Sequence, residues 1–446
     1  MIDKAREIAL KALYKVDKEG AYSNIALDEL LKSNKDIVDK RDIGLISEIV
    51  YGTTTWKLTI DEIIKKYSNI RIKKISPWIL NVLRMGIYQI IFLDKIPKSA
   101  AVNESVNLAK RYGHKSSSNF VNAILRKVSC KDYDEFFEME DKQKRLSLTT
   151  SMPSWIIEEL LKENTFEKTE EICRACNLKP KVSIRVNRLK TDLEQMKQSL
   201  DKENIEYEDG LLQDFLVLNK VKSLENLESF KEGMFTVQDE AAGLTACVLN
   251  PRPNEKVLDC CSAPGGKTTH IAEIMNNEGE VEAWDIYEHR TNLVLKNAER
   301  LGIRIINTCV QDATKFKEEY VEKFDKVLLD VPCLGIGVIK RKPDIKWKKN
   351  SEDVEGITKI QYEILEVCSK YLKKGGSIVY STCSILKEEN EKIIEKFLER
   401  NSDFEIERYN FENAEFFKKF EKDSKYIQVF PNEKTDGFFI CKMVKK

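Results

Sequence analysis

The sequence lacks any long uncharged run and contains few histidines. The longest stretches without a charged side chain, 146–157 and 375–386, hold 12 residues each. A membrane-spanning helix needs about 20 apolar residues, so we expect no membrane association. The N-terminus has no apolar run typical of a signal peptide, which favours a cytoplasmic location. Because His114, His270 and His289 are far apart, we expect no histidine-based metal site.

The eleven cysteines are scattered and odd in number. In a cytoplasmic chain this pattern indicates free thiols rather than a disulfide framework. Cys173 and Cys176 have the CxxC spacing of metal and redox sites, but no second CxxC exists. Their surroundings, TEEICRACNL, are helical in pattern. We therefore interpret them as two small residues on a helix.

The net charge is zero, with 74 basic and 74 acidic residues, which excludes a uniformly basic nucleic-acid coat protein. The charges are unevenly placed: residues 1–130 hold 23 Lys and Arg against 14 Asp and Glu, and residues 131–446 hold 51 against 60. The basic N-terminal part is typical of an anion-binding module. At roughly 150 residues per domain, 446 residues predict about three domains.

The periodicity of apolar residues divides the chain. Residues 1–130 have helical spacing throughout, which predicts an all-α bundle. The highly charged residues 131–150 are interpreted as a linker. Residues 151–235 combine helical runs with strand-like segments at 182–187 and 215–219, which predicts a small α+β module.

Residues 236–446 alternate between strand-like and helical patterns. Strands are predicted at 256–261, 279–285, 304–312, 326–332 and 377–383. This alternation predicts an α/β domain with a parallel, doubly wound sheet. Ligands of such sheets bind beyond the carboxyl ends of the strands, so we expect the chemistry in the loops that follow them.

A glycine-containing loop follows the first of these strands. It consists of Cys261, Ser262, Ala263, Pro264, Gly265, Gly266 and Lys267. A phosphate-binding P-loop would need a glycine at position 261, and the dinucleotide pattern GxGxxG is absent. A third candidate ligand, S-adenosylmethionine, needs an open loop and an acid for its ribose.

Acids follow the next two strands. Asp285 lies 19 residues after Gly266, close to the spacing expected of a ribose-binding acid. Asp312, after the third strand, is a candidate partner for the adenine amine. A single carboxylate at such a place is often only a helix cap, but the three features together favour an S-adenosylmethionine site.

The fourth and fifth strands each end near a cysteine. Cys333 stands in Asp330-Val331-Pro332-Cys333, and Cys383 stands in Ser381-Thr382-Cys383-Ser384. Both loops are expected at the edge of the sheet where the cofactor loop opens. A site that uses one thiol as nucleophile must favour its thiolate form, and it can use the second as an acid–base partner.

These motifs resemble the Sun family of RNA cytosine-C5 methyltransferases. The resemblance rests on CSAPGGKTTH, on DVPC followed by GIGVIKRKPDIKW, and on STCS, with further similarity at 184–187 and 237–242. Residues 1–130 resemble the NusB antitermination factor. The resemblance implies a Rossmann-like class I methyltransferase domain that uses S-adenosylmethionine on small-subunit (16S) rRNA. We expect a monomer.

The resemblance also implies residue roles. Cys383 would attack carbon 6 of cytosine, and Cys333 would assist proton loss from carbon 5 and release of the enzyme. Asp330 would bind the cytosine edge near the cofactor, which the loop 261–267, Asp285 and Asp312 would hold. The target base must leave its stack to reach such a site.

Basic residues after Cys333 form either a solvated surface loop or, as we expect beside an RNA-modifying site, contacts with RNA phosphates. Arg185 either pairs with an acid or, as the resemblance suggests, contacts the substrate. The phosphate candidates are Lys340, Arg341, Lys342, Lys346, Lys348 and Lys349. Two other functions stay open: an RNA-binding transcription or ribosome-assembly factor with a non-catalytic cofactor fold, and a P-loop ATPase, which nucleotide binding would reveal.

Overall fold

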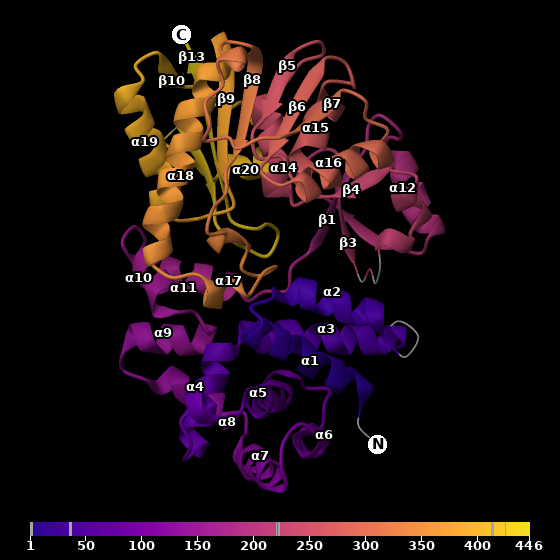
Figure 1. Ribbon diagram of the computed structural model, residues 1–446, viewed down its shortest axis with the longest axis vertical. Coiled ribbons are helices and arrows are strands. Elements are labelled where there is room, and N and C mark those ends of the chain that lie inside the picture. Colours follow the sequence, from indigo (N-terminus) through magenta and orange to yellow (C-terminus); the bar gives the residue numbers. More distant parts are fainter. Residues whose placement is uncertain (1–2, 35–37, 220, 222–223, 412–413, 424) are drawn as a thin grey trace. The chain divides into compact units, whose positions relative to one another are not determined.

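The structure is a computed structural model that describes residues 3–34, 38–219, 221, 224–411, 414–423 and 425–446 (Figure 1). The chain forms two compact units. The N-terminal unit contains residues 1–177 together with 341–349, and the C-terminal unit contains 178–340 and 350–446. No helix within the described ranges is both long and apolar enough to cross a membrane.

The N-terminal unit is all-helical, as predicted. Its helices are α1 Lys4–Lys18, α2 Ser23–Ser33, α3 Lys40–Thr55, α4 Lys57–Tyr67, α5 Pro77–Phe92, α6 Lys98–Tyr112, α7 Lys115–Lys127, α8 Lys131–Asp134, α9 Lys142–Thr150, α10 Ser154–Leu161 and α11 Phe166–Ala175. The apolar α5 is buried along most of its length and packs against α1, α3, α4, α6 and α7. Residues 131–150, interpreted above as a linker, instead fold as α8, a 3-10 turn and α9 within this unit. Cys173 and Cys176 are buried on and just beyond α11.

Residues 341–349 pack into the N-terminal unit although they lie far along the chain. The indole of Trp347 donates to the carbonyl of Thr54 at 2.7 Å, and Asp344 accepts from the Ser23 amide at 3.1 Å. This segment includes the short helix α17 Ile345–Lys348. The chain therefore leaves the C-terminal unit after Lys340 and returns to it at Asn350.

Lys346 is the most buried cation of this segment, with 1% of its surface exposed. Its ammonium donates to the carbonyls of Thr55 at 3.3 Å and Thr150 at 3.4 Å, and to Oδ1 of Asn177 at 2.7 Å. No carboxylate is among these partners. Burial therefore lowers the pKa of Lys346 to about 8.

This lowered pKa predicts a pH dependence of stability. Between about pH 8 and the ordinary pKa of 10.5, the unfolded chain holds more protons than the folded one, so the free energy of unfolding should rise with pH. The gain across this window is up to roughly 3 kcal/mol. Urea unfolding followed by tryptophan fluorescence reports mainly on the N-terminal unit, because four of the five tryptophans belong to it. Lys346→Met should remove this rise, and an unchanged pH slope in the variant would contradict the assignment.

The C-terminal unit begins with a small antiparallel sheet of strand order β2-β3-β1-β4. The strands are β1 Val182–Val186, β2 Glu206–Asp209, β3 Phe215–Asn219 and β4 Phe235–Val237, with helices α12 Leu193–Lys202 and α13 Glu228–Lys231. The two predicted strands of the α+β module are confirmed, but residues 151–177, predicted as part of this module, belong to the N-terminal unit.

The large sheet of the C-terminal unit has the order β11-β12-β13-β9-β8-β5-β6-β7, with β10 paired to β13. Its parallel strands are β5 Lys256–Asp259, β6 Glu280–Asp285, β7 Ile306–Val310, β8 Phe324–Asp330 and β9 Leu372–Thr382. The predicted parallel sheet is confirmed for these five strands, and an antiparallel group that was not predicted continues it beyond β9. This group is β10 Phe404–Ile406, β11 Glu421–Lys422, β12 Tyr426–Val429 and β13 Phe438–Lys445.

Helices cover both faces of this sheet (Figure 1). Successive strand residues point to opposite faces: Val257 and Leu328 pack with α14 Glu240–Leu249, α15 Gly266–Ile274 and α16 Glu288–Leu301. Leu258 and Val327 pack on the other face with α18 Glu352–Cys368 and α19 Glu391–Arg400. The doubly wound α/β class is thus confirmed, and the predicted site loops meet at one edge of the sheet.

Candidate active site at the strand ends

The strand order brings the predicted site residues together. Strands β6 and β7 lie on one side of β5, and β8 and β9 lie on the other side. The strand order therefore reverses at β5, and ligands of such sheets bind at this switch point. In the register, Asp259 is opposite both Ala283 and Leu328, and Asp330 is opposite Ser381. The loops after β5, β6, β8 and β9 therefore open at a common edge.

The loop between β5 and α15 is anchored to the neighbouring strand β6. Ser262 donates to the Trp284 carbonyl through its amide at 2.8 Å and its hydroxyl at 2.9 Å. Gly265 has φ +100°, a conformation that disfavours other residues, and a Cβ there would lie 3.1 Å from Cα of Val294. At Gly266, where α15 begins, a Cβ would meet only Gln238, at 3.8 Å.

This loop fits the amino-acid end of S-adenosylmethionine. The first N–H groups of α15 have no partner within the helix, and a helix N-terminus favours an anion such as the cofactor's carboxylate. At the base of the loop, Thr268 donates to Asp259 at 2.7 Å. Burial raises the pKa of Asp259 to about 7.

The two predicted acids have different surroundings. Asp285, at the end of β6, is 4% exposed and forms an ion pair with Arg290 at 3.3 Å. Arg290 also donates to the Ala263 carbonyl at 3.1 Å, which ties the acid to the loop. Asp312 is exposed and caps a turn by accepting from the amide and hydroxyl of Thr314 at 2.9 and 2.7 Å. The carboxylate of Asp285 can accept hydrogen bonds from the hydroxyls of a ribose. The contact of Asp312 with an adenine amine stays a prediction.

The two cysteines face each other. Cys333 follows β8 and Cys383 follows β9, and their Sγ atoms are 3.0 Å apart. The hydrogen bond with Cys383 and burial raise the pKa of Cys333 well above its ordinary value, and the charges of Glu389 and Asp330 act in the same direction. Cys333 is therefore a thiol in the free protein.

Lys267 turns from the cofactor loop toward the cysteines. Its ammonium donates to Asp330 at 2.7 Å, and Ser381 donates to the other oxygen of Asp330 at 3.0 Å. Burial opposes the charge of Lys267, but Asp330, with Cys383 contributing, overcomes it and raises the pKa of Lys267. The lysine therefore stays charged beside Asp330.

Several basic residues considered as substrate contacts are bonded within the protein, and for Arg185 the alternative of pairing with an acid is the one observed. Arg185 is buried and forms an ion pair with Glu273 at 2.8 Å, and it donates to the Gly266 carbonyl at 2.9 Å. It supports the cofactor loop from inside the protein. Lys340 forms a buried ion pair with Asp436 at 3.2 Å.

The ammonium groups of the buried Lys346 and the partly exposed Lys348 donate hydrogen bonds to carbonyls of the helical N-terminal unit. Lys348 donates to the carbonyls of Gly20 and Ala21 at 2.6 and 2.8 Å. The prediction of phosphate contacts is therefore wrong for the buried side chains of Lys340 and Lys346, whereas Lys348 is partly exposed and for it the contact stays a prediction. For Arg341, Lys342 and Lys349 it stays a prediction.

Two buried acids of this region were missed. Glu273 lies one turn after Thr269 on the buried face of α15, and a buried acid at such a place signals a cationic partner. Glu389 follows the second cysteine motif and accepts hydrogen bonds from the loops of both cysteines. Its neighbours in sequence, Lys387 to Glu391, resemble an ordinary charged surface segment, so no local signal marks it.

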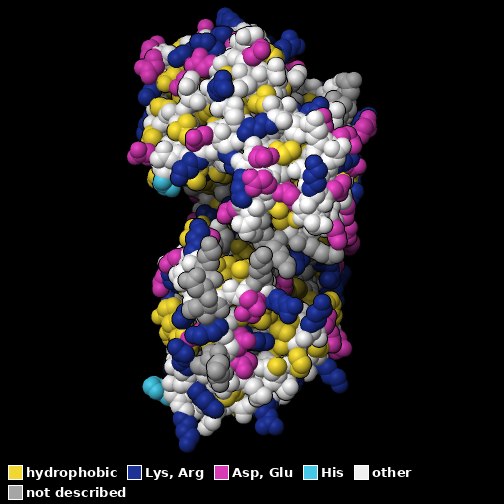
Figure 2. All heavy atoms as spheres, turned by 90° about the vertical axis from the view of Figure 1, so that its right-hand side faces the viewer, with side chains coloured by type: hydrophobic (Ala, Val, Ile, Leu, Met, Phe, Trp, Pro, Cys, Tyr) yellow, Lys and Arg dark blue, Asp and Glu magenta, His cyan; other side chains and the backbone are white. Residues whose placement is uncertain are grey.

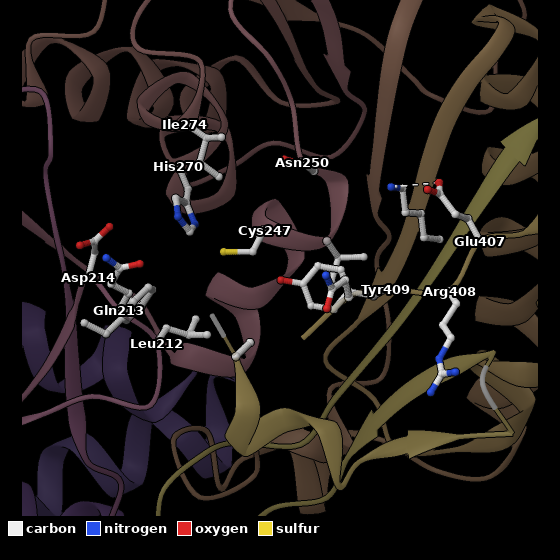
Figure 3. Close-up of a pocket in the computed structure, with 15 residues that line it drawn as sticks. Leu212, Gln213, Asp214, Cys247, Asn250, His270, Ile274, Glu407, Arg408 and Tyr409 are labelled. Carbon is white, nitrogen blue, oxygen red and sulfur yellow. Dashed lines mark ion pairs between the residues drawn. The ribbon is translucent and has the colours of Figure 1, made fainter. Parts of the chain in front are cut away.

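A cavity of about 450 Å³ lies elsewhere in the C-terminal unit (Figure 3). His270, Cys247, Asp214 and Tyr409 line it, and no predicted site residue does. Burial and the charge of Arg185 lower the pKa of His270 well below its ordinary value. Among the described residues, no group of three or more His, Cys, Asp or Glu side chains could hold a metal ion.

Three segments of the chain match known protein families. Residues 3–130 match the NusB family, and residues 152–225 match the ferredoxin-like domain of RsmF/B-like methyltransferases. Residues 246–444 match the family of 16S rRNA methyltransferases RsmB/F.

Individual relatives cover nearly the whole chain. A probable ribosomal RNA small subunit methyltransferase B of Bacillus subtilis (strain 168) is 39% identical over 99% of this chain and 98% of its own. The ribosomal RNA small subunit methyltransferase B of Shewanella oneidensis is 31% identical over 99% of both chains. A crystal structure of a methyltransferase homologue from Pyrococcus horikoshii, 26% identical, covers 69% of this chain and 100% of its own with a TM-score of 0.59. The chain therefore belongs to the family of ribosomal RNA small subunit methyltransferases B.

Proposed function

We propose that this rRNA methyltransferase transfers a methyl group from S-adenosylmethionine to carbon 5 of a cytosine in 16S rRNA. Cys383 is the nucleophile in this proposal, and Cys333 assists proton loss and release. The observation that carries the proposal is the pair of thiols, 3.0 Å apart, at the strand ends beside the cofactor loop. Carbon 5 of cytosine is not reactive enough to take a methyl group unaided. A nucleophile such as a thiolate activates it by adding to the neighbouring carbon 6.

The thiol pair explains how carbon 5 is activated. When the Cys383 thiolate adds to carbon 6, the cytosine becomes an enamine whose carbon 5 is nucleophilic. S-adenosylmethionine supplies the methyl group to that carbon. Loss of the carbon-5 proton then restores the double bond and expels Cys383 as a thiolate. In this proposal Asp330, which accepts hydrogen bonds from Lys267 and Ser381, binds the cytosine edge.

The order of events follows from what holds Cys333 protonated. The main cause of its raised pKa is the hydrogen bond with Cys383. Once Cys383 is bonded to carbon 6, this hydrogen bond and the nearby thiolate charge are gone. Two of the causes that keep Cys333 protonated are then removed, so in this proposal Cys333 acts as the base after the adduct has formed.

Bisulfite sequencing of 16S rRNA tests this function in cells. A strain that lacks the gene should lose protection at one cytosine, and the intact gene should restore it. The Cys383→Ala gene should not restore it. Full protection in the deletion strain would refute cytosine methylation by this chain and would favour an RNA-binding assembly factor.

We further propose that the N-terminal unit binds the rRNA through its basic surface. Figure 2 shows Lys and Arg side chains projecting from the lower end of this unit. Arg71, Lys73 and Lys74 are exposed together around a single 3-10 turn. Because its proposed substrate is rRNA, we expect the enzyme to act in the cytoplasm. We also expect it to be a monomer.

Replacing Arg71, Lys73 and Lys74 with glutamine in the full-length chain should weaken rRNA binding. The dependence of log affinity on log salt should flatten by about 0.7–0.9 for each phosphate that the variant no longer neutralises. Filter binding over a salt series measures the slope. Deleting residues 1–130 would be a poorer test, because it would also expose the segment 341–349. An unchanged slope with unchanged affinity would exclude this surface as an RNA-binding surface.

A further inference from the structure

The side chain of Glu389 lies buried between the two cysteine loops. One carboxylate oxygen accepts from the Leu334 amide at 2.9 Å and from Gln361 Nε2 at 3.0 Å. The other oxygen accepts from the Ser384 hydroxyl. Leu334 directly follows Cys333, and Ser384 directly follows Cys383. A single carboxylate therefore joins the residues next to both thiols.

The backbone around Glu389 is anchored to the same strand end. Glu389 ends a 3-10 turn, Lys387–Glu389, just before α19. Its carbonyl accepts from the Tyr380 hydroxyl at 2.6 Å, and the next residue, Asn390, accepts from Thr382 at 2.6 Å and donates to the Ser384 carbonyl at 3.1 Å. The carboxylate is thus held firmly on the β9 side.

The β8 side is held through Gln361 on α18. Its amide nitrogen lies within hydrogen-bonding distance of both the Pro332 carbonyl, at 2.9 Å, and Glu389. The carbonyl of Cys383 in turn accepts from the Gly337 amide at 3.0 Å. These hydrogen bonds cross between the two loops, and hydrogen bonds to a charged acceptor are the stronger ones.

We propose that Glu389 is a positioning residue that sets the spacing of Cys333 and Cys383. Its carboxylate acts through the residues that directly follow the two thiols. Its effect on methylation rests on the proposed function, but its effect on the two thiols does not.

Replacement by glutamine removes the charge and places an amide group against hydrogen-bond donors. The amide keeps only one acceptor oxygen, so either the hydrogen bond from the Leu334 amide is lost or the one from the Ser384 hydroxyl must reverse, and both lose the strength that the charge gives. The loops should separate or become mobile. Glu399→Gln is the matched control, since Glu399 is an exposed glutamate on the helix that follows Glu389.

The spacing can be read without RNA from disulfide formation by diamide. Two thiols lose two hydrogens to form the disulfide, and the diazene of diamide gains them to become a hydrazine. Peptide mapping by mass spectrometry measures the rate for the Cys333–Cys383 pair alone. Because disulfide geometry is specific, Glu389→Gln should slow this rate roughly tenfold or more. Glu399→Gln should match the wild type. Ser384→Ala, which removes the hydrogen bonds of this hydroxyl with Glu389 and with the Leu386 amide but leaves the carboxylate, should slow it less.

A second readout separates positioning from folding and from the proposed function. Glu389→Gln should lower kcat for methylation by roughly 100-fold, as expected for a misplacement of about 1 Å. Its affinity for S-adenosylmethionine should be unchanged, which would show an intact cofactor site. Wild-type rates of both disulfide formation and methylation in Glu389→Gln would overturn the inference. A slowed disulfide in a protein that methylates no cytosine even as wild type would instead refute the proposed function and leave the positioning role standing.

Discussion

Cys333→Ala is expected to accumulate as a covalent complex with rRNA that survives denaturing gel electrophoresis. The variant keeps Cys383, so the thiolate still adds to carbon 6 and the methyl group still transfers. It lacks the group that assists proton loss from carbon 5, so Cys383 cannot be expelled. The complex should appear as a slowly migrating protein band that ribonuclease digestion shifts back.

Cys383→Ala should fail differently, with no covalent complex and no methylation. The double variant should also show no complex, because the adduct depends on Cys383. A complex formed by Cys383→Ala and absent from Cys333→Ala would mean that the two roles are reversed. Full methylation by both single variants would mean that the thiols only pack against each other.

Asp285→Ala should weaken S-adenosylmethionine binding by roughly 10- to 150-fold, the equivalent of about 1.5–3 kcal/mol for the loss of a charge-assisted hydrogen bond. Asp285 is buried at the end of β6 and is linked to the cofactor loop through Arg290. Isothermal titration calorimetry measures the change directly. Glu288→Ala, an exposed acid at the start of the next helix, is the control and should bind normally.

The same titration, repeated with ATP, tests whether the loop binds a nucleotide instead of S-adenosylmethionine. Heat from ATP with none from S-adenosylmethionine would contradict the cofactor assignment and favour a P-loop ATPase. The loop sequence argues against that outcome, since position 261 is a cysteine where a P-loop needs its first glycine.

The candidate site was predictable where it depends on local pattern and strand order. Parallel strands have their carboxyl ends at one edge, so the loops after β5, β6, β8 and β9 had to meet once those strands were recognised. Asp330, Cys333 and Cys383 follow directly from that rule. The antiparallel β13 was missed because FFICKMVK is apolar on both faces for most of its length and lacks the alternation of a half-buried strand.

Interactions between distant parts of the chain could not be predicted. Arg185 and Glu273 are 88 residues apart, and Glu389 binds Leu334 across 55 residues. The burial of Lys346 in the N-terminal unit joins residues up to 291 positions apart. A charged run such as KRKPDIKWKK indicates a solvated surface by composition alone, and only tertiary packing shows that Lys346 is inside.

The most direct test of the central claim is to identify the methylated nucleoside. Purified protein is incubated with S-adenosylmethionine that carries a trideuterated methyl group and with 16S rRNA from the deletion strain, and the RNA is then digested to nucleosides for mass spectrometry. We expect trideuterated 5-methylcytidine, and none of it with Cys383→Ala. The label on any other nucleoside, or on cytidine at a position other than carbon 5, would contradict the claim.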